Sequence, residues 1–404
     1  MGEGRRIGNV NVLDLRRTTE EAVADIGGIG NVNMLVYSKE TLGLIHRLSI
    51  GNVNLSIEIP AEPELRLVAG SCEIGRDGPR EDARQAYLFV MGHVLVDSET
   101  PAEQVREHLD SLGGIAVMGC VFCPRSVAGS VQSKVSHIMG SLIAYPDDAK
   151  LIGGSLDLTT GFLSMLEGPA KLVVTGSLRS IEVVPDRISE KIASLQVHGG
   201  IVCAEENVDA LRSVLVSTRA GMTVIPAEHR FIEDELTLDE ATLSGLRDAK
   251  LCCTGNVVID QRTPPHLVDK SLSSLRSLGL ILCPEPLREA MKGKLDLLED
   301  RAIFYVGDLW QVRGEETLHP GRFEFTDGPI TLLVSGELRI AEDVPPQLLA
   351  ERLVAVHNRG EIRCSAEQMG AIEARLGLRD GEIRGLEPRD DSPYDVGNAN
   401  MLAL

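Results

Sequence analysis

The chain has 404 residues, a net charge of −20 and only 3% aromatic residues, a composition typical of thin repeat cores and unfavourable for binding nucleic acid or an anionic membrane. No apolar run approaches the ~20 residues of a membrane span. The start, MGEGRRIGNV, contains no apolar secretory segment, so the sequence favours a cytoplasmic protein without membrane insertion.

The first 60 residues repeat one tetrad. Gly-Asn-Val-Asn stands at 8–11, 30–33 and 51–54, so its glycines are 22 and 21 residues apart. The segments between the tetrads, TTEEAVADI and KETLGLIHRL, mix apolar and polar residues in a pattern that indicates short helices. Each tetrad strand with its helix forms one coil, and residues 1–72 are expected to be a set of such N-terminal coils.

The asparagines of the tetrads are predicted to form columns. Side chains alternate between the faces of a strand, so Asn9 and Asn11 share one face while Val10 and Val12 share the other. When coils stack in register, equal positions of successive tetrads lie above one another, about 4.8 Å apart. Amide side chains stacked in this way can hydrogen-bond from strand to strand. The sequence therefore predicts two asparagine ladders on the open face of a parallel sheet.

Residues 73–86 are the most loop-like part of the chain and are expected to be a linker or an irregular coil. A unit of about 80 residues then occurs four times, at 87–169, 170–248, 249–329 and 330–404. Each unit contains the pattern Gly-x-(Val/Ile)-x-Cys. The glycines are Gly119, Gly199, Gly279 and Gly360, and the cysteines are Cys123, Cys203, Cys283 and Cys364. These are expected to be structural repeat positions.

A second marker lies inside each unit: a glycine in a strand-like run is followed nine residues later by a proline, as with Gly92 and Pro101. Apolar residues after the proline recur at i, i+4 and i+7, which predicts a helix that begins there. Each unit is therefore expected to contain a strand, a helix, a strand with the cysteine, a second helix and a less regular third coil.

Coils of about 21 to 30 residues, each with one strand and one helix, resemble leucine-rich-repeat proteins in period and layout. A cysteine at the strand-to-turn position adds to the resemblance. It implies an elongated, right-handed α/β solenoid with a parallel sheet on one face and helices on the other. The letters depart from the LxxLxLxxN pattern, so the resemblance assigns no functional residue.

The tetrad returns near the end of the chain as Gly-Asn-Ala-Asn at 397–400. The last strand lacks a following neighbour and the first strand lacks a preceding one, so the two could meet between molecules. This gives the hypothesis that protomers associate end to end through 396–404 and 7–15, as filaments or rings. The alternative is that both ends are ordinary terminal coils. The residues proposed for self-association are Ile7, Asn9, Asn11, Val396, Asn398, Asn400 and Met401.

The known motifs of catalysis and cofactor binding are not found. Cys120 and Cys123 form a CxxC, but no second pair accompanies them, and repeat-equivalent cysteines are more simply explained as buried thiols. The sequence cannot decide whether this CxxC has a redox role. GGIGNVN at 27–33 has Asn33 in place of the third glycine of a dinucleotide-binding loop. We therefore expect no catalytic residue, cofactor or metal site.

Two functions fit these features. One is a non-enzymatic scaffold that assembles with itself through its terminal strands. The other is a monomeric repeat scaffold that binds a different protein through the broad face, by residues such as Arg179, Arg339 and Arg363. A third possibility, an enzyme with a site in the irregular coil at 303–325, has the least support.

Overall fold

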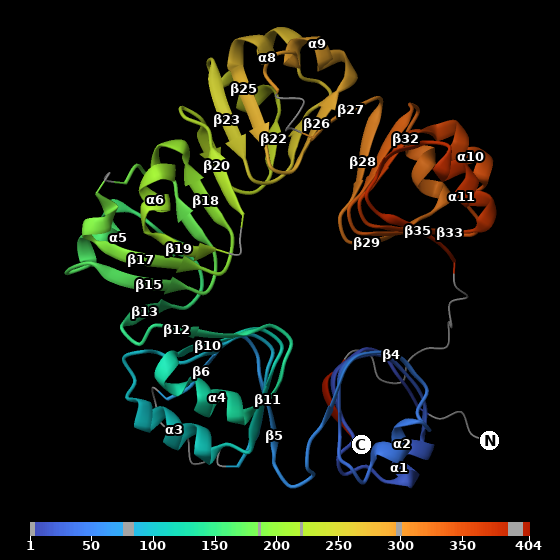
Figure 1. The fold of residues 1–404 in the computed structure, drawn as a ribbon. Helices are drawn as coiled ribbons and strands as arrows, with labels where there is room; N and C mark the ends of the chain where they lie inside the picture. Colours follow the sequence, from blue (N-terminus) through green and yellow to red (C-terminus); the bar gives the residue numbers. More distant parts are fainter. Residues whose placement is uncertain (1–4, 76–84, 185–186, 219–220, 296–300, 387–398) are drawn as a thin grey trace. The chain divides into compact units, whose positions relative to one another are not determined.

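The computed structural model describes residues 5–75, 85–184, 187–218, 221–295, 301–386 and 399–404 (Figure 1). In these ranges short strands pair in parallel and short helices lie between many of them, so the protein is α/β with a repeat-like layout. The chain divides into two compact units. Unit 1 is Met1–Cys203, Asn207–Thr223 and Asp391–Leu404, and unit 2 is Ala204–Glu206 and Val224–Asp390.

The first coil stack contains the tetrads and forms one sheet, with the order β4-β3-β2-β36 across its main part. Its strands are β1 (Arg5–Ile7), β2 (Val10–Asp14), β3 (Ile26–Tyr37), β4 (Ile50–Glu58) and β36 (Ala399–Ala403), and its helices are α1 (Glu20–Ala24) and α2 (Leu42–Ile45). Strand β1 pairs with the beginning of β3, ahead of β2. The N-cap of α1 is Thr19, whose side chain accepts a hydrogen bond from the Ala22 backbone at 3.2 Å.

The later coils differ from the first stack because most of them give two strands, one to each of two sheets. In the second stack (65–145) the sheets are β5-β7-β9-β11 and β6-β8-β10-β12. The elements are β5 (Leu65–Val68), β6 (Cys72–Glu73), β7 (Tyr87–Val90), β8 (Val94–Leu95), α3 (Ala102–Ser111), β9 (Gly114–Val117), β10 (Val121–Pro124), η2 (Arg125–Val127), α4 (Ala128–Lys134), β11 (Val135–Ile138) and β12 (Leu142–Tyr145).

The third stack (149–225) has the same plan, with sheets β13-β15-β17-β19 and β14-β16-β18-β20. Its elements are β13 (Ala149–Ile152), β14 (Leu156–Asp157), α5 (Thr160–Met165), β15 (Ala170–Val174), β16 (Leu178–Ser180), η3 (Ile188–Glu190), β17 (Ile192–Val197), β18 (Ile201–Ala204), η4 (Glu205–Asn207), α6 (Val208–Val214), β19 (Leu215–Thr218) and β20 (Met222–Ile225).

The fourth stack (230–305) has sheets β21-β23-β25 and β22-β24-β26-β27. Its elements are β21 (Arg230–Ile232), β22 (Leu236–Leu238), α7 (Glu240–Ser244), β23 (Ala249–Cys253), β24 (Val257–Ile259), α8 (Pro265–Ser271), β25 (Leu272–Ser277), β26 (Leu280–Pro284), η5 (Glu285–Leu287), α9 (Arg288–Met291) and β27 (Arg301–Tyr305).

The fifth stack (308–385) has sheets β28-β30-β32-β34 and β29-β31-β33-β35. Its elements are β28 (Asp308–Val312), β29 (Glu315–Leu318), η6 (Pro320–Phe325), β30 (Ile330–Val334), β31 (Glu337–Ile340), α10 (Pro346–Arg352), β32 (Leu353–Asn358), β33 (Glu361–Cys364), α11 (Ala366–Glu373), β34 (Leu376–Arg379) and β35 (Glu382–Gly385). Helix α11 begins with a capping box formed by Ser365 and Gln368.

The expectation of one strand per coil and one parallel sheet is therefore wrong for the later stacks. Most of these coils turn once more than expected, and in most of them a glycine lies at the corner between the two strands; the corner between β21 and β22, at 233–235, has none. At Gly360 an added Cβ would lie 2.0 Å from the Gly336 carbonyl oxygen, and at Gly119 it would lie 2.4 Å from that of Gly92. Stacked backbones approach so closely at these corners that they exclude a side chain. Gly199 and Gly279 occupy the same kind of corner, where an added Cβ would lie 2.5 Å from the Gly176 carbonyl carbon and 2.8 Å from that of Gly255.

The four repeat cysteines lie in four separate cores. Cys123, Cys203, Cys283 and Cys364 are each fully buried, in the second, third, fourth and fifth stack respectively. Further apolar clusters join sheets of neighbouring stacks within a unit. In unit 1, Val12 and Met34 of the first stack pack with Tyr87 and Phe89 of the second.

Candidate functional site

The last strand of the chain pairs with the first tetrad strand of the same molecule. Strand β36 lies parallel to β2, with Val10 opposite Ala399 and Val12 opposite Met401. The Ala399 backbone donates a hydrogen bond to the Asn9 carbonyl at 2.9 Å. The strands that the end-to-end hypothesis pairs between molecules are thus paired within one. Val396 and Asn398, also proposed for self-association, lie outside the described residues.

The predicted asparagine columns are present. In the longer column, Asn54 donates from Nδ2 to Asn33 Oδ1 at 2.8 Å, Asn33 donates to Asn11 at 2.8 Å, and Asn11 donates to Asn400 at 3.0 Å. This chain of amides crosses four strands without interruption, from β4 to β36. Hydrogen-bonded chains of this kind polarise one another and fix the register of the strands that carry them.

The second column is shorter. Asn31 donates from Nδ2 to Asn9 Oδ1 at 3.0 Å, and its backbone N–H also points to that oxygen, at 3.3 Å. A backbone donor defines which amide atom of Asn9 is the oxygen, and so defines the direction of the column. On β4, Asn52 does not continue this column but donates to Asn54 Oδ1 at 2.9 Å within its own strand. The longer column is therefore capped at its β4 end.

The strands bend where the asparagines of the longer column lie. Val32 and Leu35 pack in the same core although they are three residues apart, whereas Met34 packs on the other side of the sheet. In a regular strand, residues three apart point to opposite faces, so β3 is irregular between Val32 and Leu35. The amides of Asn33 and its column neighbours bridge the strands at this bend, where the apolar faces change sides.

The outer strands of this sheet are β4 and β36, and the outward edge of each pairs with no other described strand. Strand β4 has nine residues, and its only charged residue is the last, Glu58. Strand β36 has five residues, none of them charged, and its Met401 side chain is 38% exposed. Among the described residues no group accepts a hydrogen bond from Asn400 Nδ2. Ile7, in contrast, is buried in the core of the stack.

A buried ion pair holds the end of β2. Arg16 donates to both carboxylate oxygens of Asp14, at 2.9 and 2.7 Å, and to the carbonyls of Pro60 and Pro63, at 3.2 and 2.6 Å. The neighbouring Arg17 is exposed and donates to the Ala61 carbonyl at 2.9 Å. Both arginines thus fasten the segment that leads to the second stack. Nothing in the sequence DLRR separates the buried arginine from the exposed one, so sequence reasoning missed this pair.

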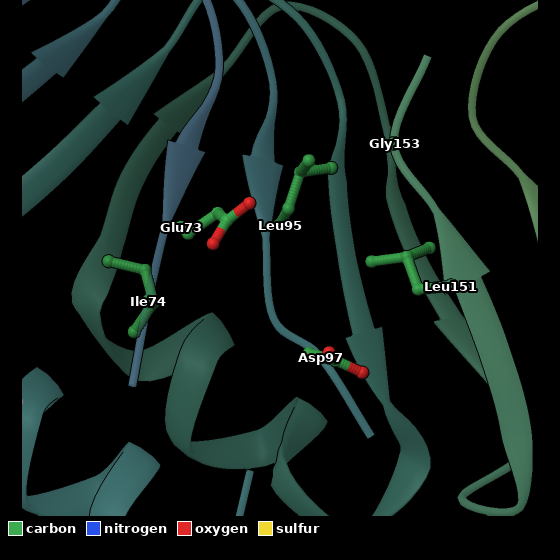
Figure 2. Close-up of a pocket in the computed structure, with 6 residues that line it drawn as sticks. All are labelled: Glu73, Ile74, Leu95, Asp97, Leu151 and Gly153. Carbon is green, nitrogen blue, oxygen red and sulfur yellow. The ribbon is translucent and has the colours of Figure 1, made fainter. Parts of the chain in front are cut away.

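A pocket of about 230 Å³ lies beside the second and third stacks of unit 1 (Figure 2). Its lining combines the carboxylates of Glu73 and Asp97 with the apolar side chains of Leu95 and Leu151. Asp97 also accepts a hydrogen bond from the Glu99 backbone at 3.1 Å, so it caps a turn. Two carboxylates without a third ligand do not define a metal site, and the described residues hold no group of three His, Cys, Asp or Glu side chains arranged for a metal.

Six of the eight cysteines are buried, Cys72 and Cys120 are half-buried, and none of the eight forms a disulfide. Burial raises the pKa of Cys123 to about 11 and that of Cys283 to about 12. A thiol with such a pKa is almost entirely protonated at neutral pH and is a poor nucleophile. In the CxxC, Cys123 lies in the core, whereas Cys120 lies half-buried in the preceding turn, where its backbone donates to His93 Nδ1 at 2.9 Å.

The irregular coil at 303–325, the alternative location for an enzyme site, is filled by its own side chains. Trp310 packs against Phe323 with ring centroids 5.3 Å apart, and the Arg322 guanidinium lies 4.4 Å from the Trp310 ring. Both rings belong to the core of the fifth stack. These contacts give the tryptophan a packing role.

The arginines considered for binding another protein lie on inner strands of their sheets: Arg179 on β16, Arg339 on β31 and Arg363 on β33. Arg179 forms a two-pronged pair with Asp157, at 2.7 and 2.6 Å. Arg363 lies 3.1 Å from Glu337 and 2.8 Å from Glu361. Arg339 stands opposite Arg363 on the neighbouring strand. Acidic and basic residues thus alternate along the β29-β31-β33-β35 sheet in unit 2.

Comparison with known proteins does not assign the chain to a class, so its class is described from the structure alone. No family model, no curated protein and no solved structure matches the chain. In the described ranges no helix is both long enough and apolar enough to cross a membrane. The structure defines an α/β protein of parallel strands in a repeat-like layout, whose most distinctive site is the asparagine ladder of the first stack.

Proposed function

We propose that the protein is a non-enzymatic, cytoplasmic scaffold that associates with further copies of itself through the sheet of the first stack. Its coil stacks would serve as the α/β solenoid of this scaffold. The observation that carries the proposal is the chain of amides from Asn54 to Asn400, which ends on an uncharged outer strand. Outer strands are usually short or charged, because an unpaired strand invites further pairing.

The expected strength of such an association is modest. Pairing along the five residues of β36 would add about four or five main-chain hydrogen bonds, each contributing ~0.5–1.5 kcal/mol net. Association costs on the order of 4–15 kcal/mol in lost motion before any contact stabilises it. Main-chain pairing alone, ~2–7 kcal/mol, barely offsets this cost. Burial of apolar side chains such as Met401 must contribute as well, so we expect assembly only at concentrations of about tens to hundreds of micromolar.

The direct test uses sedimentation velocity at about 10 and about 300 µM, because these concentrations bracket the range in which assembly is expected. The informative variant is Met401→Lys, which places a charge on the outer strand without shortening it. The control is Met165→Lys, because Met165 is also exposed but lies at the end of α5. We expect concentration-dependent growth in the wild type and the control and its loss in Met401→Lys. A wild type that remains monomeric at the higher concentration would refute the proposal.

A second function, the binding of a different protein, is favoured by one observation. The β29-β31-β33-β35 sheet carries Glu337 and Glu361 in one column and Arg339, Arg363 and Arg384 in the next. Several of these pairs are half-exposed, so they contribute little to folding and are available to a partner of alternating charge. Replacing Arg339 and Arg363 by glutamate should abolish such binding and leave self-association unchanged.

A further inference from the structure

We propose that the partner of β36 is β4 of a second copy, added in parallel and in the register of the existing sheet, so that tetrad meets tetrad. This inference rests on the proposed function, because it names the strand that self-association would use. It differs from the end-to-end hypothesis, in which the last strand of one molecule pairs with the first strand of another.

The register follows from the pairs inside the molecule. Val12 lies opposite Met34 on one side and opposite Met401 on the other, and Met34 lies opposite Leu55. Met401 and Leu55 are therefore the same rung of the repeat on the two outermost strands. A copy that continues the sheet brings its Leu55 opposite Met401, and its Asn54 opposite Asn400.

Both strands have the properties of an edge left open for pairing. The other outer strands of the described sheets have two to six residues, whereas β4 has nine. Long outer strands are normally protected by lysine, proline or a bulge. Neither β4 nor β36 contains a lysine, an arginine or a proline.

The amides at the two edges are complementary. Asn400 presents Nδ2, a donor, at the β36 edge, and Asn54 presents Oδ1, an acceptor, at the β4 edge. That oxygen already accepts from Asn52, but an amide oxygen has two lone pairs and can accept a second hydrogen bond. The donor-to-acceptor direction of the column would thus continue across the boundary between copies.

The apolar side chains of the same rung also match. Met401 is exposed, and Leu55 is only partly buried. Pairing of the two strands would cover both side chains and extend the row formed inside the molecule by Val12 and Met34. Such a contact joins different surfaces of two identical copies, so it can repeat and produces a ring or a polar filament.

The test is disulfide cross-linking between singly substituted proteins, in a background with the half-buried Cys72 and Cys120 replaced by serine. Met401→Cys is mixed with Leu55→Cys under mild oxidation, and covalent dimers are counted by denaturing electrophoresis. All asparagines remain in place. We expect dimers in the mixture at least tenfold above those of either protein alone. Unfolding curves of each variant confirm that it is folded.

A second mixture separates this arrangement from strand exchange. Met401→Cys with Val12→Cys forms dimers only if the last strand of one molecule replaces that of another, because these residues face each other within one chain. Dimers in this mixture, and not in the first, would overturn the β4 assignment while keeping self-association. Large particles that form neither cross-link would also overturn the β4 assignment while keeping self-association. A protein that stays monomeric at about 300 µM would overturn both the inference and the proposed function.

Discussion

Removing the buried guanidinium of Arg16 should destabilise unit 1 more than removing any exposed arginine. The side chain is 5% exposed and its partner carboxylate, Asp14, is 10% exposed. Arg16→Ala leaves that carboxylate buried without its cation, and it also leaves the carbonyls of Pro60 and Pro63 without a donor. Arg17→Ala is the matched control, because Arg17 is exposed and donates to carbonyls of the same segment.

The magnitude follows from burial. Breaking a buried, hydrogen-bonded ion pair by removing one partner costs about 3–5 kcal/mol, whereas an exposed contact contributes at most about 1 kcal/mol. With a urea m-value of about 3 kcal/mol/M, Arg16→Ala should lower the midpoint of unit 1 by about 1–2 M, and Arg17→Ala by less than about 0.4 M. In the double variant Asp14→Ala/Arg16→Ala no unpaired charge remains, so the loss should be smaller than the sum of the single losses.

The protein offers an internal control for the assay. Its single tryptophan, Trp310, belongs to unit 2, whereas circular dichroism follows the strands and helices of both units. We expect the part of the dichroism transition that reports unit 1 to shift to lower urea in Arg16→Ala, while the midpoint of the tryptophan fluorescence is unchanged. Equal midpoints for Arg16→Ala and Arg17→Ala would refute the argument from burial.

Three further outcomes are expected. Gly360→Ala should lower the free energy of unfolding by more than about 2 kcal/mol, because the added Cβ would lie 2.0 Å from a carbonyl oxygen. Gly370→Ala lies on open helix surface and should raise the free energy of unfolding by up to about 1 kcal/mol. Equal urea midpoints for the two variants would contradict this expectation. Burial raises the pKa of Cys283 to about 12, so the unfolded state loses its proton first above pH ~8.5, and stability should fall as the pH rises from about 9 toward 12; Cys283→Ala should flatten this slope in denaturation curves. Asn11→Ala removes the hydrogen bond to the last strand, so hydrogen exchange at 399–403 should speed up by about threefold to tenfold; unchanged protection would show that the ladder does not hold the strand.

The asparagine ladder could be predicted from the sequence because its signal is purely periodic. A tetrad repeated at 22 and 21 residues specifies a register, and in-register asparagines at 4.8 Å spacing must lie within hydrogen-bond reach. The same reasoning could not foresee that Asn52 turns to Asn54. Asn54 lies on the same outer strand and does continue its column, so neither the tetrad nor the position at the edge specifies which amide turns aside.

The second strand of most later coils was missed for a different reason. The run FVMGHVLV contains apolar residues on both sides of its glycine, and it reads equally well as one long strand or as two short ones. Periodicity cannot separate these cases, because residues of such a strand are buried on both faces. Burial around Gly92 decides the matter: its Cβ would lie 2.2 Å from the Gly70 carbonyl, so the backbone turns a corner there.

The location of the last strand depends on chain connectivity, which the letters do not specify. A Gly-Asn-Ala-Asn strand matches the edge of β2 equally well whether it comes from the same chain or from another. Within one chain the local concentration of the strand is high, and pairing inside the molecule is favoured at ordinary protein concentrations. The structure accordingly places β36 on β2 of its own molecule.

Pairing within the molecule does not close the sheet. A parallel strand has two edges, so β36 covers the edge of β2 and presents its own edge in exchange. The donor end of the amide column therefore moves outward by one strand, from Asn11 to Asn400. Removing the last strand would return that end to β2, where Asn11 could receive β4 of another copy in the same register. Deletion of the terminal strand should for this reason preserve self-association, whereas a lysine at Met401 should prevent it. If both changes prevent assembly equally, the repeating edge is not what joins the copies.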